Sequence, residues 1–600
     1  MAPRSITQYL EEKIAAAERK ISLNDSFPVG SLISHYSSHP SSSALVTLGN
    51  TTAGSVLSDI TPSFLGLINA SRLAGCVAVQ TQIPTVQSAY GVSDLNETHP
   101  RPIIHQQSSV LCPTSVPNRV AEFLLSTYTS RIIHQCPVVC EEEAKATFNA
   151  VLSSSSCHPR DLFVVSLIMA ISLSTSARNN LARAKSLAGA LFKYGMMQLS
   201  AALTNDLQGL QALLLLIHYT FLNPTVGNLW LLTGISNEAC IDLGLHQELL
   251  SFTDQDASSL NVRRRIFWCA WEMEIAVSAA FRRPIRILNR HINVCFPDPC
   301  QPYSPSFPAL SWIPNLIWRF RQIEAELVSV LHLNHPLPPD VRSLETWMIG
   351  LEKKAFLWAQ EVQQLAAYND SPLTKSQWSE MLNYANIAHN YCLVLLYGPS
   401  NKVKAPTRPS LMRAFQASVR VAEAYWEQTN TEFGRIKYTF HTCYHTFSAA
   451  IVFLKVLQSC ISEINELFSL DEIHNFAQCF VRLLSSLGER WPAATRCLEE
   501  YNLLLNPIME TYSNHCLSMQ QVCAVDYLPP QINLYYAPPP SNVSFSQGSD
   551  AIHYEDFTHI FNPPLGAMSE PLFGFPTDIP FDWDTEFDFG MDTLLDVAAD

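Results

Sequence analysis

The chain has 600 residues, of which 47% are apolar and only 15% are charged, so it can bury a large core and is not disordered throughout. Its formal net charge of −15 excludes a protein that wraps nucleic acid through bulk positive charge. The 20 glycines are about half the usual share, which counts against folds that depend on glycine-rich phosphate-binding loops.

The negative charge is concentrated at the C-terminal end. No Lys or Arg follows Arg496, whereas residues 497–600 contain 16 Asp or Glu. The stretch 1–496 is therefore close to neutral. This asymmetry is typical of a globular body that carries an acidic interaction tail.

The first 115 residues predict two different segments. In residues 1–24, Leu10, Ile14, Ala17 and Ile21 recur at the alternating four- and three-residue spacing of a coiled-coil seam. Such a short helix is marginal alone, so a solvated N-terminal helix is an equally good interpretation. Residues 25–115 are rich in Ser and Thr, with few charges and no helical period, and predict a poorly ordered linker.

Residues 116–515 predict a large all-α domain, because apolar residues recur at helical spacing almost throughout and strand-like alternation is nearly absent. One clear helix is expected over 260–281, and a single long helix over 436–463. Residues 516–600 contain clustered prolines, followed by acids and aromatics, and are expected to be disordered in isolation.

The sequence favours a protein that is not an enzyme and has no cofactor in this chain, because the common catalytic and nucleotide-binding fingerprints are missing. It has no C-x-x-C pair, no signal peptide and no apolar run long enough to span a bilayer, so no membrane partner is expected. Two groupings resemble partial metal sites, but each lacks a second ligand pair, so packed or surface residues are favoured and no metal is predicted. They are His134, Cys136 and Cys140, and His441, Cys443 and His445.

The segment 227–299 carries an ordered series of motifs: a tryptophan helix with an inner glycine, a stop ending in histidine, an arginine-rich aromatic helix and a proline turn. Its key residues are Trp230, Gly234, Leu243, Gly244, Leu245, His246, Arg264, Arg265, Phe267, Trp268, Arg283 and Pro284. Gly244 suits the left-handed position after a helix end, and Gly234 indicates a close approach between helices. For Arg263–Arg265, contacts with carboxylates or helix ends are favoured over an import signal or a phosphate contact.

In order and spacing, this segment closely resembles the fungal-specific transcription factor domain, the helical middle region of fungal zinc binuclear cluster regulators. Other helices extend the resemblance over residues 115–500, and it implies a transcription regulator in the nucleus, of a metabolic or secondary-metabolite pathway. There are two departures. Glu274-Ile275 stands where the family often has Asp-Arg, and Arg282 stands where the family's proline turn has glycine.

The six-cysteine zinc module of that family has no counterpart in this sequence, whose first cysteine is Cys76. Two hypotheses follow. Either the protein is a co-regulator or antagonist that pairs with an intact relative, or an upstream exon supplies the module and its zinc. Direct DNA contact is expected only if the module is supplied in cis or by a partner, and a homo- or heterodimer is compatible with the coiled-coil-like helix.

Large apolar side chains alternate with acids at the end of the chain. They include Phe581, Trp583, Phe587, Phe589, Leu594 and Leu595. This composition is typical of an acidic activation segment that folds on contact with an apolar groove of a transcriptional coactivator. A tail that only solubilises the protein, or docks on its body, is the alternative. The sequence therefore predicts a transcriptional activator.

Overall fold

The computed structural model describes residues 110–153, 157–176, 181–224, 226–248, 257–298, 313–368, 373–430, 440–490 and 494–525. Within these ranges the chain forms helices joined by turns and loops, and no strand, so the predicted all-α class is confirmed. The expected helix in 1–24, nearly all of the linker 25–115 and most of the tail 516–600 lie outside the described residues.

The first half of the described chain packs around two helices that are apolar on nearly every face, α9 (Pro159–Ser176) and α12 (Leu207–Leu222). Every residue of α12 from 210 to 217 is buried, because neighbouring helices cover all of its sides. The surrounding elements are η3 (Pro113–Ser115), α7 (Asn118–Thr127), η4 (Tyr128–Ile132), α8 (Glu141–Ser153), α10 (Leu181–Met197), α11 (Leu199–Ala202) and α13 (Leu229–Asp242).

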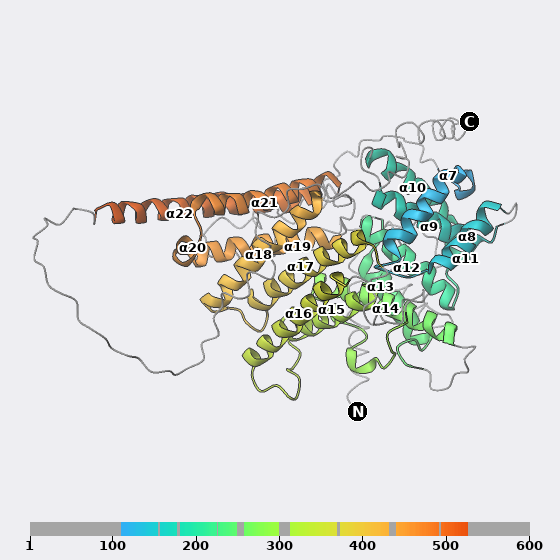
Figure 1. Cartoon of the computed structure of the whole chain (residues 1–600), viewed down its shortest axis with the longest axis horizontal. Coiled ribbons are helices and arrows are strands. Elements are labelled where there is room, and N and C mark those ends of the chain that lie inside the picture. The colour runs from blue at the N-terminus through green and yellow to red at the C-terminus, as the bar shows by residue number, and fades with distance from the viewer. Residues whose placement is uncertain are drawn as a thin grey trace, which may run out of the picture.

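The second half is a layered array in which α16, α17, α18 and α19 pack in chain order, and α21 and α22 cover α18 and α19 (Figure 1). Its elements are α15 (Ile313–Leu327), η8 (Val328–His332), α16 (Leu344–Ala366), α17 (Lys375–Tyr397), α18 (Arg408–Asn430), α19 (Phe440–Ser459), α20 (Ile461–Leu467), α21 (Leu470–Arg490) and α22 (Thr495–Val525).

The two halves meet at α14 (Ala257–Phe281), which is followed by the short η6 (Asn289–His291). Helix α14 packs against α12 and α13 on one side and against α15 and α19 on the other. Residues 266–278 of α14 are all buried except Glu272, which is partly exposed. Two halves of the molecule thus share one buried helix.

The helix expected over 436–463 is wrong in one respect, because the chain turns sharply at Cys460. The backbone of Cys460 leaves the helical region at φ −128° and ψ 41°, and α19 and α20 meet at 101°. This turn buries Cys460 and Ile464 completely where α20 packs on α19 and α22. Helix α22 continues to Val525, ten residues beyond the domain boundary expected at 515.

In the part of the chain that the structure describes, no helix by itself has the length and apolar content needed to cross a bilayer. Helices α19 and α20 meet that requirement only when they are counted together as a bent pair.

The start of α12 depends on a glycine. The Asp206 side chain accepts a hydrogen bond of 2.8 Å from the Gly209 N–H and caps the helix. A Cβ atom at Gly209 would lie only 1.9 Å from the carbonyl oxygen of Thr204, which belongs to the backbone of the preceding turn. The first turn of this central helix therefore has no room for a side chain.

We expect Gly209→Ala to destabilise the fold by about 2–3 kcal/mol, because the turn before α12 must shift to admit the methyl group. Gly350→Ala is the matched control, since Gly350 lies in α16 with open space around its Cβ position. The control should stabilise the protein by about 0.5–1 kcal/mol through helix propensity. Thermal unfolding followed by circular dichroism measures both, and equal effects of the two variants would contradict the expectation.

Candidate functional site

The motif residues of 227–299 gather where α13 packs on α14, and the stop after α13 has the expected form. Gly244 has φ +63°, in the left-handed region. The Leu245 N–H donates to the Cys240 carbonyl at 2.8 Å, and the Gly244 N–H donates to the Ile241 carbonyl at 3.0 Å. Leu245 itself is buried. This is a Schellman end, so the prediction for Gly244 and Leu245 is confirmed.

The close approach at Gly234 is made by a side chain rather than by a helix backbone, which corrects the sequence-based interpretation. A Cβ at Gly234 would lie 2.8 Å from Nη2 of Arg286. The Arg286 guanidinium covers the ring of Trp230, with 3.8 Å between its Cζ and the ring centroid. Gly234 is therefore needed because a cation stacks on the tryptophan one turn before it.

Arg286 forms an ion pair with Glu274, whose carboxyl group has no accessible surface. Glu274 Oε1 accepts 2.7 Å from the Arg286 backbone N–H and 3.5 Å from its Nη1. Burial raises the pKa of Glu274 to about 7, and the contacts with Arg286 oppose this rise. The Glu274 that departs from the family pattern thus has a defined local partner.

The arginine cluster at the start of α14 joins parts of the fold, as the sequence analysis favoured. Arg263 Nη2 donates 2.9 Å to the Leu243 carbonyl at the end of α13. Arg264 makes a two-pronged pair with Glu248, with Nη2 to Oε1 at 2.9 Å. Arg265 is almost completely buried and reaches Glu143 on α8 at 3.0 Å. All three guanidinium groups contact groups of the same chain.

The aromatic motif residues lie in the core beside these arginines. Phe267 and Trp268 are both buried, with their rings edge to face at 5.4 Å. The Trp268 indole N–H donates 2.9 Å to the Cys295 carbonyl, so it fixes the segment that leaves the proline turn. The motif residues are therefore structural neighbours, which bring three segments of the chain together.

The turn after α14 keeps the backbone shape of a glycine although its residue is Arg282. Arg282 has φ 51°. The Arg283 N–H donates to the Ser278 carbonyl at 3.0 Å, which makes a second Schellman end. Arg283 then lies 4.9 Å from the ring of Trp230, and Pro284 follows it. Arginine in place of the family's glycine makes the left-handed backbone of this turn less favourable in free energy, but the hydrogen bonds of the turn are still formed.

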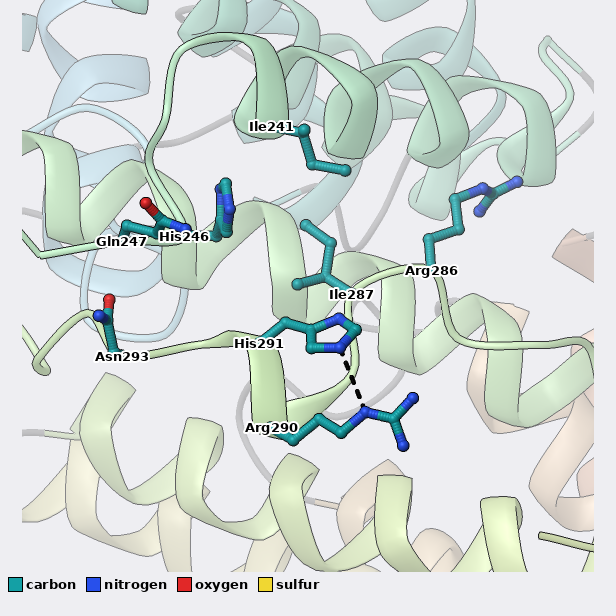
Figure 2. A pocket seen from close by; sticks show the side chains of 8 residues that line it. All are labelled: Ile241, His246, Gln247, Arg286, Ile287, Arg290, His291 and Asn293. Atoms are coloured by element: carbon teal, nitrogen blue, oxygen red, sulfur yellow. Dashed lines mark hydrogen bonds between the residues drawn. The ribbon is translucent and has the colours of Figure 1, made fainter.

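A surface pocket of about 420 Å³ opens beside these residues (Figure 2). Its lining includes two arginines and two histidines but no Asp or Glu, so it is suited to an anionic group. Arg290 Nε donates to His291 Nε2 at 3.2 Å, the dashed line in Figure 2. The lining residues are Ile241, His246, Gln247, Arg286, Ile287, Arg290, His291 and Asn293.

A second hollow, here called the central cavity, lies inside the molecule and was not predicted from the sequence. It has a volume of about 240 Å³ and lies among α12, α14, α15, α17, α18 and α19. Its lining is mostly apolar, with a cluster of polar groups. The sequence feature that could have indicated this cavity is the presence of the charged residues Arg321 and Glu324 among the apolar residues of α15. The polar cluster is Glu272, Arg321, Glu324, Tyr384, His441 and His445.

The charges in the central cavity are coupled. Arg321 Nη1 lies 2.6 Å from Glu324 Oε2, and Arg321 Nε lies 3.9 Å from Glu272 Oε1. Burial raises the pKa of Glu272 to about 7, although Arg321 opposes the rise. Burial, followed by the charge of Arg321, lowers the pKa of His445 to about 3 and that of His441 in the same direction. Both histidines are therefore neutral at neutral pH.

The structure separates the members of both partial metal groupings. His441 and His445 line the central cavity, with ring centroids 5.9 Å apart, whereas Cys443 is buried and interacts with Cys497. Cys136 lines the cavity, but Cys140 lies near Glu143. Among the described residues, no three His, Cys, Asp or Glu side chains are placed to hold a metal ion. The six apolar tail residues from Phe581 to Leu595 lie outside the described residues.

The comparisons with known proteins concern this same region. Residues 125–302 match the family described as "Fungal specific transcription factor domain". The chain is also 22% identical to "Pyrimidine pathway regulatory protein 1" of Saccharomyces cerevisiae, over 51% of this chain and 34% of the relative.

Two further relatives show the same partial coverage. "Protein STB5" of Saccharomyces cerevisiae is 24% identical over 53% of this chain and 43% of the relative. "Positive regulator of purine utilization" of Emericella nidulans is 22% identical over 52% of this chain and 36% of the relative. The matches thus span between 34% and 43% of the length of these curated relatives.

We expect Arg282→Gly to be more stable than Arg282→Ala by about 1 kcal/mol, because both remove the side chain but only glycine adopts the left-handed backbone without strain. The same two substitutions at Arg283 provide the control, since that residue has no positive φ. There, alanine should be at least as stable as glycine. Urea unfolding of the four variants measures the differences. A glycine preference of the same size at both positions would contradict the backbone argument.

We expect Glu274→Gln to gain stability relative to the wild type as pH rises from about 4.5 to about 7, by up to about 3 kcal/mol. In the wild type the folded state holds the Glu274 proton more tightly than the unfolded state. The protonated carboxyl therefore stabilises the folded state fully at a pH below the pKa of Glu274 in the unfolded chain. This stabilisation is lost as pH rises through the pKa of Glu274 in the folded protein. Glutamine has no proton to lose. Melting temperatures measured across this range test the prediction, and a constant difference between variant and wild type would refute it.

Proposed function

We propose that this protein, whose residues 125–302 match the fungal specific transcription factor domain, is a fungal regulator of transcription that acts in the nucleus. The match of this domain is the observation that carries the proposal. The printed names of the first relatives support it, because they describe regulators rather than enzymes.

The described body serves regulation rather than DNA reading in this proposal. Sequence-specific readout needs basic side chains that can enter a groove or contact phosphates. The most basic run of the body, Arg263–Arg265, instead contacts α13, Glu248 and α8. DNA contact is therefore assigned to a six-cysteine zinc module, supplied elsewhere in the same protein or by a partner.

Activation is assigned to the acidic tail. Residues 497–600 contain no Lys or Arg, and large apolar side chains alternate with acids near the end. Acids keep such a segment solvated, while its aromatic side chains remain available to the apolar groove of a coactivator. The target is proposed to be a metabolic pathway, since two relatives are named for a pyrimidine pathway and for purine utilization.

The alternative is a co-regulator that pairs with a relative containing the zinc module. The two proposals differ in the 5′ end of the native transcript and in the intact mass of the native protein. An upstream segment with six cysteines would support the DNA-binding activator, whereas a native start at Met1 would direct the search to the DNA-binding partner.

We expect residues 565–600, fused to an unrelated DNA-binding domain, to raise transcription of a reporter well above the level of that domain alone. Replacing the six apolar tail residues by alanine should abolish the signal, because the partner's groove loses the side chains that it binds. The matched control replaces Thr577, Thr585 and Thr593 by alanine and should retain activity. A silent wild-type fusion, expressed at the level of the control, would remove activation from the proposal.

A further inference from the structure

The central cavity is lined by one guanidinium group and three carboxyl groups, those of Glu272, Glu324 and Glu380, and the first two lie on either side of the guanidinium. Arg321 and Glu324 form a close ion pair within α15, whereas Glu272 on α14 reaches Arg321 only at 3.9 Å. The side chains of Arg321 and Glu324 keep less than a tenth of their accessible surface, and Glu272 keeps 16%. When Glu272 and Glu324 are both ionised, their two negative charges exceed the single positive charge of Arg321, and Glu380 adds no positive charge to the lining.

Glu272 also has a buried oxygen atom, Oε2, that accepts no hydrogen bond of ordinary geometry from the described residues. Burial raises the pKa of this carboxyl, and the charge of Arg321 and a hydrogen-bonding contact from the Trp318 side chain oppose the rise without cancelling it. A buried acceptor without a donor is unfavourable by about 1–3 kcal/mol, and more when it is charged. The site thus needs a donor, and preferably one with a positive charge.

The walls around Glu272 restrict which molecule could supply that donor. They are largely apolar or aromatic, including Met273, Ile317, Phe320 and Tyr384, and their polar groups include Gln135, Gln377, Gln428 and Glu380. The imidazoles of His441 and His445 are neutral, and Arg321 is the only Arg or Lys among the lining residues. An anion would meet a guanidinium already paired with Glu324, and would add a further negative group to a cavity lined by three carboxyl groups. A cation with an apolar body meets none of these obstacles.

We propose that the central cavity binds a small, mostly apolar molecule with a protonated nitrogen, whose N–H group donates a hydrogen bond to Glu272 Oε2. The aromatic rings at the walls favour the same charge through their negative faces. As an effector site this inference rests on the proposed regulatory function, but the binding itself does not.

The position of the cavity explains how occupancy would affect the rest of the protein. Its lining comes from α12 and α14 in the first half and from α15, α17, α18 and α19 in the second. A ligand that contacts both halves stabilises the arrangement in which they enclose it. The two halves that share α14 are thereby coupled to the ligand.

The charge on Glu272 makes binding dependent on pH. The other titratable groups that line the cavity come from every element packed around Glu272. They are Cys136, His218 on α12, Arg321 and Glu324 on α15, Glu380, Tyr384, Tyr391 and Cys392 on α17, Tyr425 on α18, and His441 and His445 on α19. Because the pKa of Glu272 is about 7, its ionised fraction and the affinity for a cation should rise about tenfold from about pH 6 to about pH 8. The pKa values of His441 and His445 are lowered, so neither adds a charge in this range.

The test compares three probes with the same aromatic body: 2-phenylethylamine, 2-phenylethanol and phenylacetate. Saturation-transfer NMR on the full chain measures their affinities. We expect the amine to bind at least about tenfold more tightly than the alcohol, because its hydrogen bond to Glu272 is assisted by charge, and phenylacetate to bind least. Only the amine should gain affinity as pH rises. Amine binding no tighter than that of the alcohol, a preference for phenylacetate, or no amine binding at millimolar concentration would overturn the proposal.

Two variants and a control locate the binding. Glu272→Gln should reduce the amine to the affinity of the alcohol, while Ala276→Leu should block both by filling the cavity. Glu326→Gln is the matched control on α15, where Glu326 pairs with Lys354 and does not line the cavity, and it should bind like the wild type. Melting temperatures show whether each variant folds. An unchanged amine affinity in a folded Glu272→Gln protein would overturn the site, whereas a silent tail fusion would affect only the proposed function.

Discussion

The burial of two carboxyl groups on α14 is the constraint on which the rest of the structure depends. Glu272 and Glu274 are two residues apart, so they point to nearly opposite sides of the helix. Glu272 faces the central cavity and Arg321, whereas Glu274 faces Arg286 near the surface pocket. Each carboxyl group loses most of its water on folding. Each must therefore be balanced by a neighbouring guanidinium or by a proton.

Arginines on α14 and in the loop after it hold this helix in place. Arg263 joins its first turns to the end of α13, and Arg265 joins them to α8. Arg286 returns from the loop after α14 and stacks on Trp230, for which Gly234 leaves space. The positive charges of Arg263–Arg265, which in the sequence resemble a nucleic-acid contact, are therefore engaged in contacts within the protein. The regulatory body is specified by these contacts and by the apolar core around α9 and α12.

Helix α14 and the segment that follows it border two hollows of opposite chemical character. The surface pocket presents Arg286 and Arg290 to solvent, while the central cavity presents Glu272 to the interior. Both hollows are bounded by α14 or the segment that follows it. A change in the charge or occupancy of either one would act on the helix that both halves share.

The sequence by itself determined the all-α class, the acidic tail and the helix end at Gly244, because periodicity, composition and turn chemistry are local properties of the chain. It also indicated that Arg263–Arg265 serve the fold. Only the tertiary structure decided which group lies against Gly234, where the chain turns at Cys460, and that Glu272, Arg321 and His445 share one cavity. These residues are far apart in the sequence. Their meeting depends on how six helices pack, and helical periodicity assigns a residue to a face without stating what that face contacts.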